Sequence, residues 1–240
     1  MHAGWILFAG LAGYVGIGGS AAAESGPTPR YAQKMADCAK TEFTTYLGKH
    51  DDDPALSDRI DQYFAAIRYP RSAHWSGAFV SYCVKQTDAT GQQFGFSSGH
   101  WAYIQQAMKG IPGTFNACRI EDCPILLGDI VSRNRFDPAN KNPKGPLNGE
   151  VTYDGAPQAG MFPSHSSIVV GFQAKDGVRY AEVILGAAGP PGANKCADDN
   201  ARYSAGDEAI VGRQCFELTA AGTLKQLTSN PFIAVVRSPK

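Results

Sequence analysis

The hydrophobic pattern changes along the chain, and this change constrains the fold more than any other feature of the sequence. In the first half, apolar residues recur at helical spacing, as Ile60, Phe64 and Ile67 do. Three aspartates and Pro54 precede that segment and suit a helix N-terminus, because acidic side chains favour its positive end and proline fits its first turn. The pattern predicts four helices, over residues 31–47, 54–69, 73–85 and 101–109.

The second half of the chain carries strand patterns instead. Residues 166–172 and 178–185 are short strand-like runs, and the intervening QAKDG is a hairpin signal. Residues 125–132 form a short apolar run, residues 133–163 are predicted as a long loop, and residues 232–236 as a last strand. Helices followed by an antiparallel meander predict an α+β fold.

The composition is that of one globular domain with elaborations. The 240 residues are 43% hydrophobic and 18% charged, which suffices for an ordinary buried core. The 22 basic and 22 acidic residues balance, so no basic excess indicates a nucleic-acid surface. We therefore expect no nucleic-acid partner.

Residues 1–23 are predicted to be a secretory signal. Their apolar run is short and glycine-rich for a membrane span, and alanines at 21–23 offer a small-residue cleavage site. An uncleaved membrane anchor is the alternative. We expect a secreted or periplasmic protein without stable membrane insertion after cleavage.

The six cysteines all follow this segment, and an even number in an exported chain favours disulfides. One pair flanks the short loop RIED, a second brackets a polar insert, and the third follows by elimination. The predicted pairs are Cys118–Cys123, Cys196–Cys215 and Cys38–Cys83. Since no pair has CxxC spacing and no histidine adjoins a cysteine, we expect no metal site and no cofactor.

Ser76 is the candidate nucleophile, because it lies in the first turn of the third predicted helix. Unpaired backbone N–H groups at such a helix end can hold an oxyanion. A serine there needs a neighbouring base, and the alternative is a simple helix-capping residue.

Histidines supply the candidate bases. His165 begins the strand in PSHSSIVV and is the first candidate, and His100 is the second. His100 and Tyr103 lie one helical turn apart and are expected to line a substrate groove. Asp129, in LLGDIV, is expected to be a structural acid that caps a turn or orients a neighbour.

Three segments, HWSGAFVSYC, LLGDIV and SHSSIVVGF, together resemble CHAP-like and NlpC-type amidases. These are papain-like cysteine hydrolases that cut peptidoglycan peptides or related amides. The nearer resemblance, which includes FGFSSGHWAYI, is to the bacterial domain-of-unknown-function family 2272 and covers roughly residues 55–190. It implies a papain-like fold with N-terminal helices packed on an antiparallel sheet. The expected division is a signal (1–23), an N-terminal extension and helix (24–53), the hydrolase domain (54–190) and a Cys-containing C-terminal extension with a final strand (191–240).

Carried onto this sequence, the resemblance implies that Ser76 is the nucleophile and His165 the base. We expect Gly77 to contribute to the oxyanion site, and Trp75 to line the groove with His100 and Tyr103. The chain departs from the cysteine hydrolases in two ways. It has serine for cysteine, and it has Ala187 and Ala188 where a polar residue that orients the histidine is expected.

The leading functional hypothesis is therefore an exported hydrolase that cleaves an amide or peptide bond in peptidoglycan with a Ser–His pair. A non-catalytic module that binds the cell envelope is the alternative from another class. A third hypothesis is an esterase or acyltransferase, because a Ser–His pair suits esters better than amides.

Overall fold

The computed structural model of the protein describes residues 30–135, 151–188, 196, 210–228 and 230–239. The predicted signal, residues 1–23, lies outside them, as does the middle of the predicted loop, residues 136–150. Among the described residues, no helix is long and apolar enough to span a bilayer.

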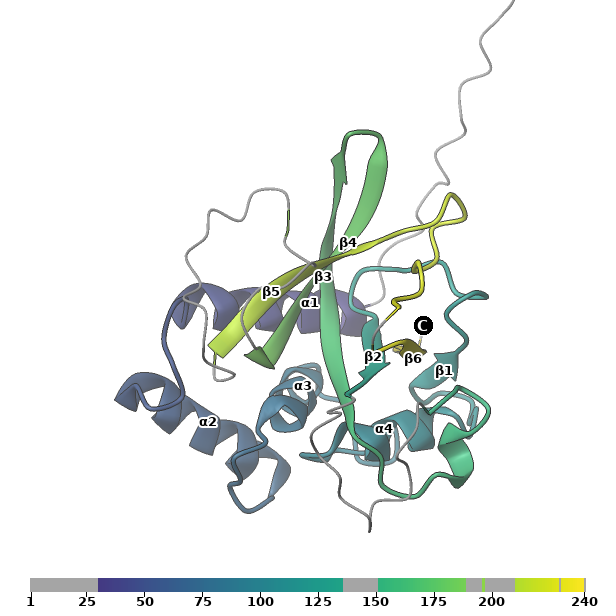
Figure 1. Ribbon diagram of the computed structural model, residues 1–240. Helices are drawn as coiled ribbons and strands as arrows, with labels where there is room; N and C mark the ends of the chain where they lie inside the picture. Colours follow the sequence, from purple (N-terminus) through teal and green to yellow (C-terminus); the bar gives the residue numbers. More distant parts are fainter. Residues whose placement is uncertain (1–29, 136–150, 189–195, 197–209, 229, 240) are drawn as a thin grey trace, which may run out of the picture.

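A six-stranded sheet forms the centre of the molecule (Figure 1), and every strand pair in it is antiparallel. The strand order is β1-β6-β2-β3-β4-β5. The strands are β1 (Asn116–Cys118), β2 (Ile130–Asn134), β3 (Ser164–Lys175), β4 (Val178–Ala188), β5 (Ile210–Glu217) and β6 (Phe232–Arg237). With the helices that precede it, this sheet confirms the predicted α+β class.

Four helices precede the strands in the chain: α1 (Arg30–Thr45), α2 (Pro54–Ile67), α3 (Ser76–Lys85) and α4 (His100–Ala107). The helices α1, α3 and α4 pack against the sheet, and α2 packs against α3. The short 3-10 helix η1 (Ala156–Gln158) lies between β2 and β3 in the chain and contacts α4. Side chains alternate across a strand, so Ile168 and Val170 of β3 join the core formed with the helices. Val169 instead joins a second cluster on the opposite face.

The sequence predicts the start of a helix correctly where a capping residue is present. Asp53 accepts a hydrogen bond from the Ala55 N–H at 2.9 Å, and Pro54 opens α2. The third helix begins at Ser76, not near residue 73 as the sequence predicts. Trp75 precedes its first turn and is buried in the core, so packing decides where this helix starts.

The predicted hairpin is confirmed, and its strands are longer than the sequence pattern indicates. Asp176 and Gly177 form the two-residue turn between β3 and β4, with φ of 51° and 78°. Two central residues with positive φ match the right-handed twist of the flanking strands.

The C-terminal segment of the chain completes the sheet. The predicted strand over residues 232–236 is confirmed as β6, which lies between β1 and β2. The strand β5, which the sequence pattern did not indicate, pairs with β4. Residues 191–240, expected to be an extension, thus contribute two strands to the same sheet as residues 54–190.

All three predicted disulfides are confirmed, and no cysteine is free. The bond between Cys38 and Cys83 joins α1 to α3, with 5.5 Å between the two Cα atoms. Disulfides persist in oxidising compartments, so the three bonds indicate an extracellular or periplasmic setting.

Candidate functional site

Ser76 is the first residue of α3, and its hydroxyl points at a histidine. The distance from Ser76 Oγ to His100 Nε2 is 2.7 Å, a short hydrogen bond. His100 is in turn the first residue of α4. Two helix N-termini therefore meet at this bond, and both side chains are buried, with 4% and 5% of their surface exposed.

Contacts behind this bond hold the two helix ends together. The Ser81 hydroxyl, on α3, donates to the Ser97 carbonyl at 2.7 Å and accepts from the Ser97 N–H at 3.1 Å. Gly77 lies against the Ser98 carbonyl, where an added Cβ would come within 2.1 Å of the oxygen. Glycine is thus required at position 77 for the turn before α4 to approach the start of α3.

Hydroxyl groups continue the chain of hydrogen bonds on the far side of His100. Its Nδ1 bonds to the Tyr103 hydroxyl, and the Ser166 side chain lies close enough to this phenol to influence its pKa. Ser166 Oγ lies 2.8 Å from Ser132 Oγ, on the neighbouring strand. We call Ser76, His100, Tyr103, Ser166 and Ser132 the serine–histidine cluster.

The direction of the hydrogen bonds on the two ring nitrogens decides whether His100 can act as a base. If Nδ1–H donates to Tyr103, then Nε2 is free to accept the Ser76 proton. If the Tyr103 hydroxyl donates to Nδ1 instead, Nε2 carries the ring proton and donates to Ser76. Both arrangements satisfy the two hydrogen bonds of His100, and only the first prepares Ser76 for nucleophilic attack.

Burial keeps the members of the cluster neutral. Desolvation, with a smaller contribution from Arg135, lowers the pKa of His100 to about 3. Desolvation also raises the pKa of Tyr103 above its usual value, so the phenol keeps its proton. An uncharged imidazole at neutral pH is the form that accepts a proton.

His165 lies beside the cluster and does not bond to Ser76. Its ring centroid is 5.2 Å from that of His100, and its Nε2 is buried without a hydrogen-bond partner. Burial is the main cause that lowers the pKa of His165 well below its usual value, followed by the charges of His100, Arg133 and Arg135. The structure thus brings the two predicted partners Ser76 and His165 into one region but places His100 between them.

Two further residues that the sequence singles out lie in the core and at a turn. Trp75, expected in the groove, is 1% exposed and stacks on Tyr63 with 6.1 Å between ring centroids, so it lies in the core. Asp129 accepts hydrogen bonds from the Leu126 N–H at 2.8 Å and from Arg237 at 2.7 and 2.9 Å. It holds the turn before β2 and pairs with the last strand, as a structural acid does.

The sequence analysis did not single out Ser132 or Ser166, nor the contact between Tyr103 and His100. A partial signal was present, because strand alternation in SHSSIVV puts Ser166 on the same face as Ile168. The residue that bonds to Nδ1 of His100 is Tyr103, from α4, and not a residue near Ala187.

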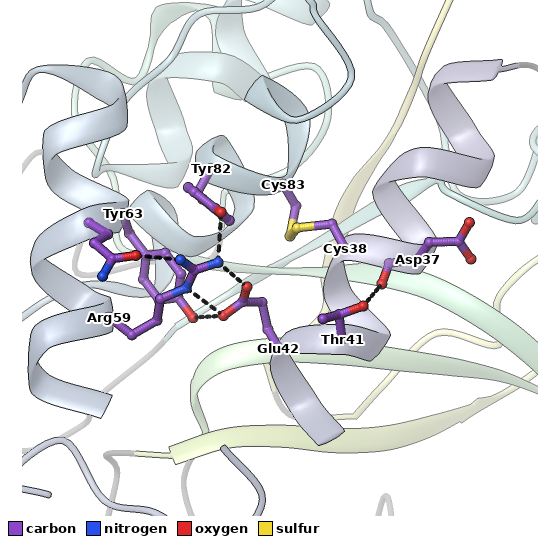
Figure 2. Close-up of polar contacts among 9 residues, drawn as sticks. Asp37, Cys38, Thr41, Glu42, Arg59, Tyr63, Tyr82 and Cys83 are labelled. Atoms are coloured by element: carbon purple, nitrogen blue, oxygen red, sulfur yellow. Dashed lines mark hydrogen bonds and ion pairs between the residues drawn. A yellow bond between two sulfur atoms is a disulfide. The ribbon is translucent and has the colours of Figure 1, made fainter. Parts of the chain in front are cut away.

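A second buried polar cluster joins α1, α2 and α3 (Figure 2). The Glu42 carboxylate accepts from Arg59 Nε at 3.0 Å, from a second Arg59 nitrogen, and from the Tyr63 hydroxyl at 2.7 Å. Arg59 also donates to the Tyr82 hydroxyl at 2.6 Å and lies 4.6 Å from the centroid of its ring. We call Glu42, Arg59, Tyr63 and Tyr82 the glutamate–arginine cluster.

No group of three or more potential metal ligands occurs among the residues that the structure describes. Comparison with curated proteins gives no match, and neither does comparison with solved structures. A family described as uncharacterized proteins conserved in bacteria, DUF2272, matches residues 35–188, from α1 to the end of β4. Because this match spans more than half of the chain, the protein belongs to the DUF2272 family.

Proposed function

We propose that this protein is an exported serine hydrolase that cleaves an amide or peptide bond in peptidoglycan, with Ser76 as nucleophile and His100 as base. The observation that carries the proposal is the 2.7 Å bond from Ser76 Oγ to His100 Nε2 at the start of a helix. A nucleophile and a base within hydrogen-bond reach, with a third group bonded to the base, is the pattern of nucleophilic catalysis.

In the first step, Ser76 Oγ attacks the carbonyl carbon while its proton moves to His100 Nε2. The carbonyl oxygen becomes an oxyanion. Backbone N–H groups in the first turn of α3, at Ser76 and Gly77, lack intrahelical acceptors and supply donors to that oxygen.

In the second step, the bond from carbon to the leaving nitrogen breaks, and His100 returns its proton to that nitrogen. This leaves an acyl ester on Ser76. Water then attacks the ester and gives its proton to His100. The bond between the acyl carbon and Ser76 Oγ breaks, and His100 returns the proton to Oγ, which releases the acid and restores the serine hydroxyl.

Tyr103 takes the place of the acid that orients the base in many hydrolases. In this mechanism the Tyr103 hydroxyl accepts from Nδ1–H of His100, which leaves Nε2 to act as the base. A neutral phenol stabilises the imidazolium less than a carboxylate does, so we expect a slow enzyme.

The papain-like fold and the peptidoglycan substrate rest on the resemblance to CHAP-like and NlpC-type amidases. Two features support them. The helix that carries Ser76 packs on β3 and β4 of an antiparallel sheet, and three disulfides suit an exported protein.

A non-catalytic cell-envelope binding module is the second candidate, and the burial of Ser76 favours it. Only 4% of this side chain is exposed, and no carboxylate joins the cluster among the described residues. In this case the cluster is a satisfied polar core.

A digest separates the two candidates. Purified protein, Ser76→Ala and His100→Gln are incubated with peptidoglycan and soluble muropeptides, and products are read by mass spectrometry. Ser72→Ala is the matched control, because Ser72 is exposed and bonds only to the His74 carbonyl among the described residues.

We expect new fragments from the wild type and from Ser72→Ala, with a loss of at least about 10,000-fold in Ser76→Ala. Fragments with a new free amine identify an amidase, whereas deacylated sugars identify an esterase. If all four proteins bind sacculi and none yields fragments, the binding module is correct and the hydrolase proposal is wrong.

A further inference from the structure

His165 lies beside His100 of the serine–histidine cluster, and Arg133 is its partner on the neighbouring strand. They face each other in the register of β2 and β3, which makes their side chains neighbours on the sheet. His165 is 5% exposed, and its Nε2 has no hydrogen-bond partner. A buried imidazole nitrogen without a partner is uncommon, and it indicates a site that something else completes.

Arg133 differs in its bonding partner from three other half-buried arginines of the described residues. Those arginines each contact a carboxylate, in the pairs Arg59–Glu42, Arg213–Glu182 and Arg237–Asp129. Arg133 instead donates to the neutral Gln214 Oε1 at 3.3 Å and lies 5.7 Å from the Phe216 ring centroid. No carboxylate of the described residues forms an ion pair with it.

A cation removed from water without an anion beside it is unfavourable, and a bound anion relieves that penalty. We infer that Arg133 and His165 form an anion subsite that takes a free carboxylate of the substrate close to the bond that Ser76 attacks. The identity of the cleaved bond rests on the proposed function. The binding of a carboxylate rests on the geometry of these two side chains.

The subsite is close to the reacting atoms. The His165 ring centroid lies 5.2 Å from that of His100, whose Nε2 is 2.7 Å from Ser76 Oγ. This path corresponds to about two or three extended peptide residues, at ~3.5 Å each. A peptide whose carboxylate lies that far from the scissile amide therefore reaches both Ser76 and the subsite.

A carboxylate fits these donors better than other anions. The guanidinium presents a planar fork that matches two carboxylate oxygens, and the imidazole N–H adds a third donor. The positive charges of Arg133 and Arg135 both act on His165, so the field at the subsite also favours an anion.

Binding is measured first, without any turnover. The full chain with nitrogen-15 histidine is titrated with acetate, with acetamide as the neutral isostere and with inorganic phosphate. The His165 ring signals are identified by their loss in His165→Gln. We expect acetate to shift them saturably in the wild type and in Ser76→Ala, and acetamide to leave them unchanged.

Variants then test the role of Arg133. Arg133→Gln should weaken acetate binding by about tenfold or more, and Arg133→Lys should weaken it less. Arg71→Gln is the matched control, because Arg71 is exposed and pairs with Asp61 at 2.7 Å. Equal shifts by acetate and acetamide, stronger binding of phosphate, or undiminished binding in Arg133→Gln would each overturn the inference.

Turnover tests the substrate class separately. Two peptide amides are compared that differ only in a free or amidated carboxylate two or three residues from the scissile bond. We expect kcat/KM to favour the free acid by about tenfold, and Arg133→Gln to remove this preference. Hydrolysis without any preference would contradict the subsite, whereas acetate binding without hydrolysis would refute only the proposed function.

Discussion

The two buried polar clusters of this molecule are built in opposite ways. The glutamate–arginine cluster is charged and closed, because both Glu42 oxygens accept hydrogen bonds from Arg59 or Tyr63 (Figure 2). The serine–histidine cluster is neutral, and the ring beside it, that of His165, keeps an unbonded nitrogen. Both carboxylate oxygens of the first cluster are bonded, whereas the second contains the serine that we propose as the nucleophile and lies beside a histidine nitrogen without a partner.

Their positions in the fold match this difference. The glutamate–arginine cluster joins three helices and lies near the disulfide between Cys38 and Cys83, on the same helices α1 and α3 (Figure 2). The serine–histidine cluster joins the first turns of α3 and α4 to β2 and β3. Buried polar groups can fix a fold or carry chemistry. We propose the first role for the glutamate–arginine cluster and the second for the serine–histidine cluster.

The largest expected effect concerns which histidine is the base. His100→Gln should lower kcat by about 1,000-fold on the peptidoglycan substrate, because the bond to Ser76 is lost. His165→Gln should instead raise KM for acidic substrates and change kcat by less than about tenfold. Steady-state kinetics on both variants measures this split, and the reverse pattern would make His165 the base.

The next effect tests the closed cluster. Glu42→Ala leaves Arg59 without its carboxylate and should lower the free energy of unfolding by about 3 kcal/mol. Asp61→Ala, which removes an exposed partner of Arg71, is the control and should change it by less than about 1 kcal/mol. Urea unfolding measures both. Equal losses of unfolding free energy in the two variants would show that the buried cluster does not stabilise the packing of the three helices.

The third effect concerns the pH dependence of stability. The pKa of His100 is about 3 in the folded protein and 6.5 for an ordinary histidine, so between these values the unfolded chain binds the extra proton. The free energy of unfolding should therefore fall as the pH drops from 6.5 toward 3, by on the order of 3 kcal/mol at about pH 4.

Urea unfolding at several pH values measures this loss. The dependence of the unfolding free energy on pH should become weaker in His100→Gln. It should stay as strong as in the wild type in Ser72→Ala, which removes no titratable group. A slope that is unchanged in His100→Gln would mean that the buried histidine is already charged in the folded protein.

Much of the fold was predictable, because its signals are local. The spacing of Ile60, Phe64 and Ile67 and the cap at Asp53 define α2, and Asp176–Gly177 defines the hairpin. The pairing of the cysteines also followed from the sequence. The start of α3 was wrong by three residues, since the burial of Trp75, and not helix propensity, sets it.

The sequence by itself determined the helices, the hairpin and the pairing of the cysteines. It also singled out Ser76, His100 and His165 as candidate site residues. Only the tertiary structure decided that His100 is the residue that bonds to Ser76, with Tyr103 behind it. It also decided that β6 lies between β1 and β2. The physical reason is the same in both cases. Periodicity and caps act over a few residues, whereas a hydrogen bond between two helix ends depends on how the whole core packs.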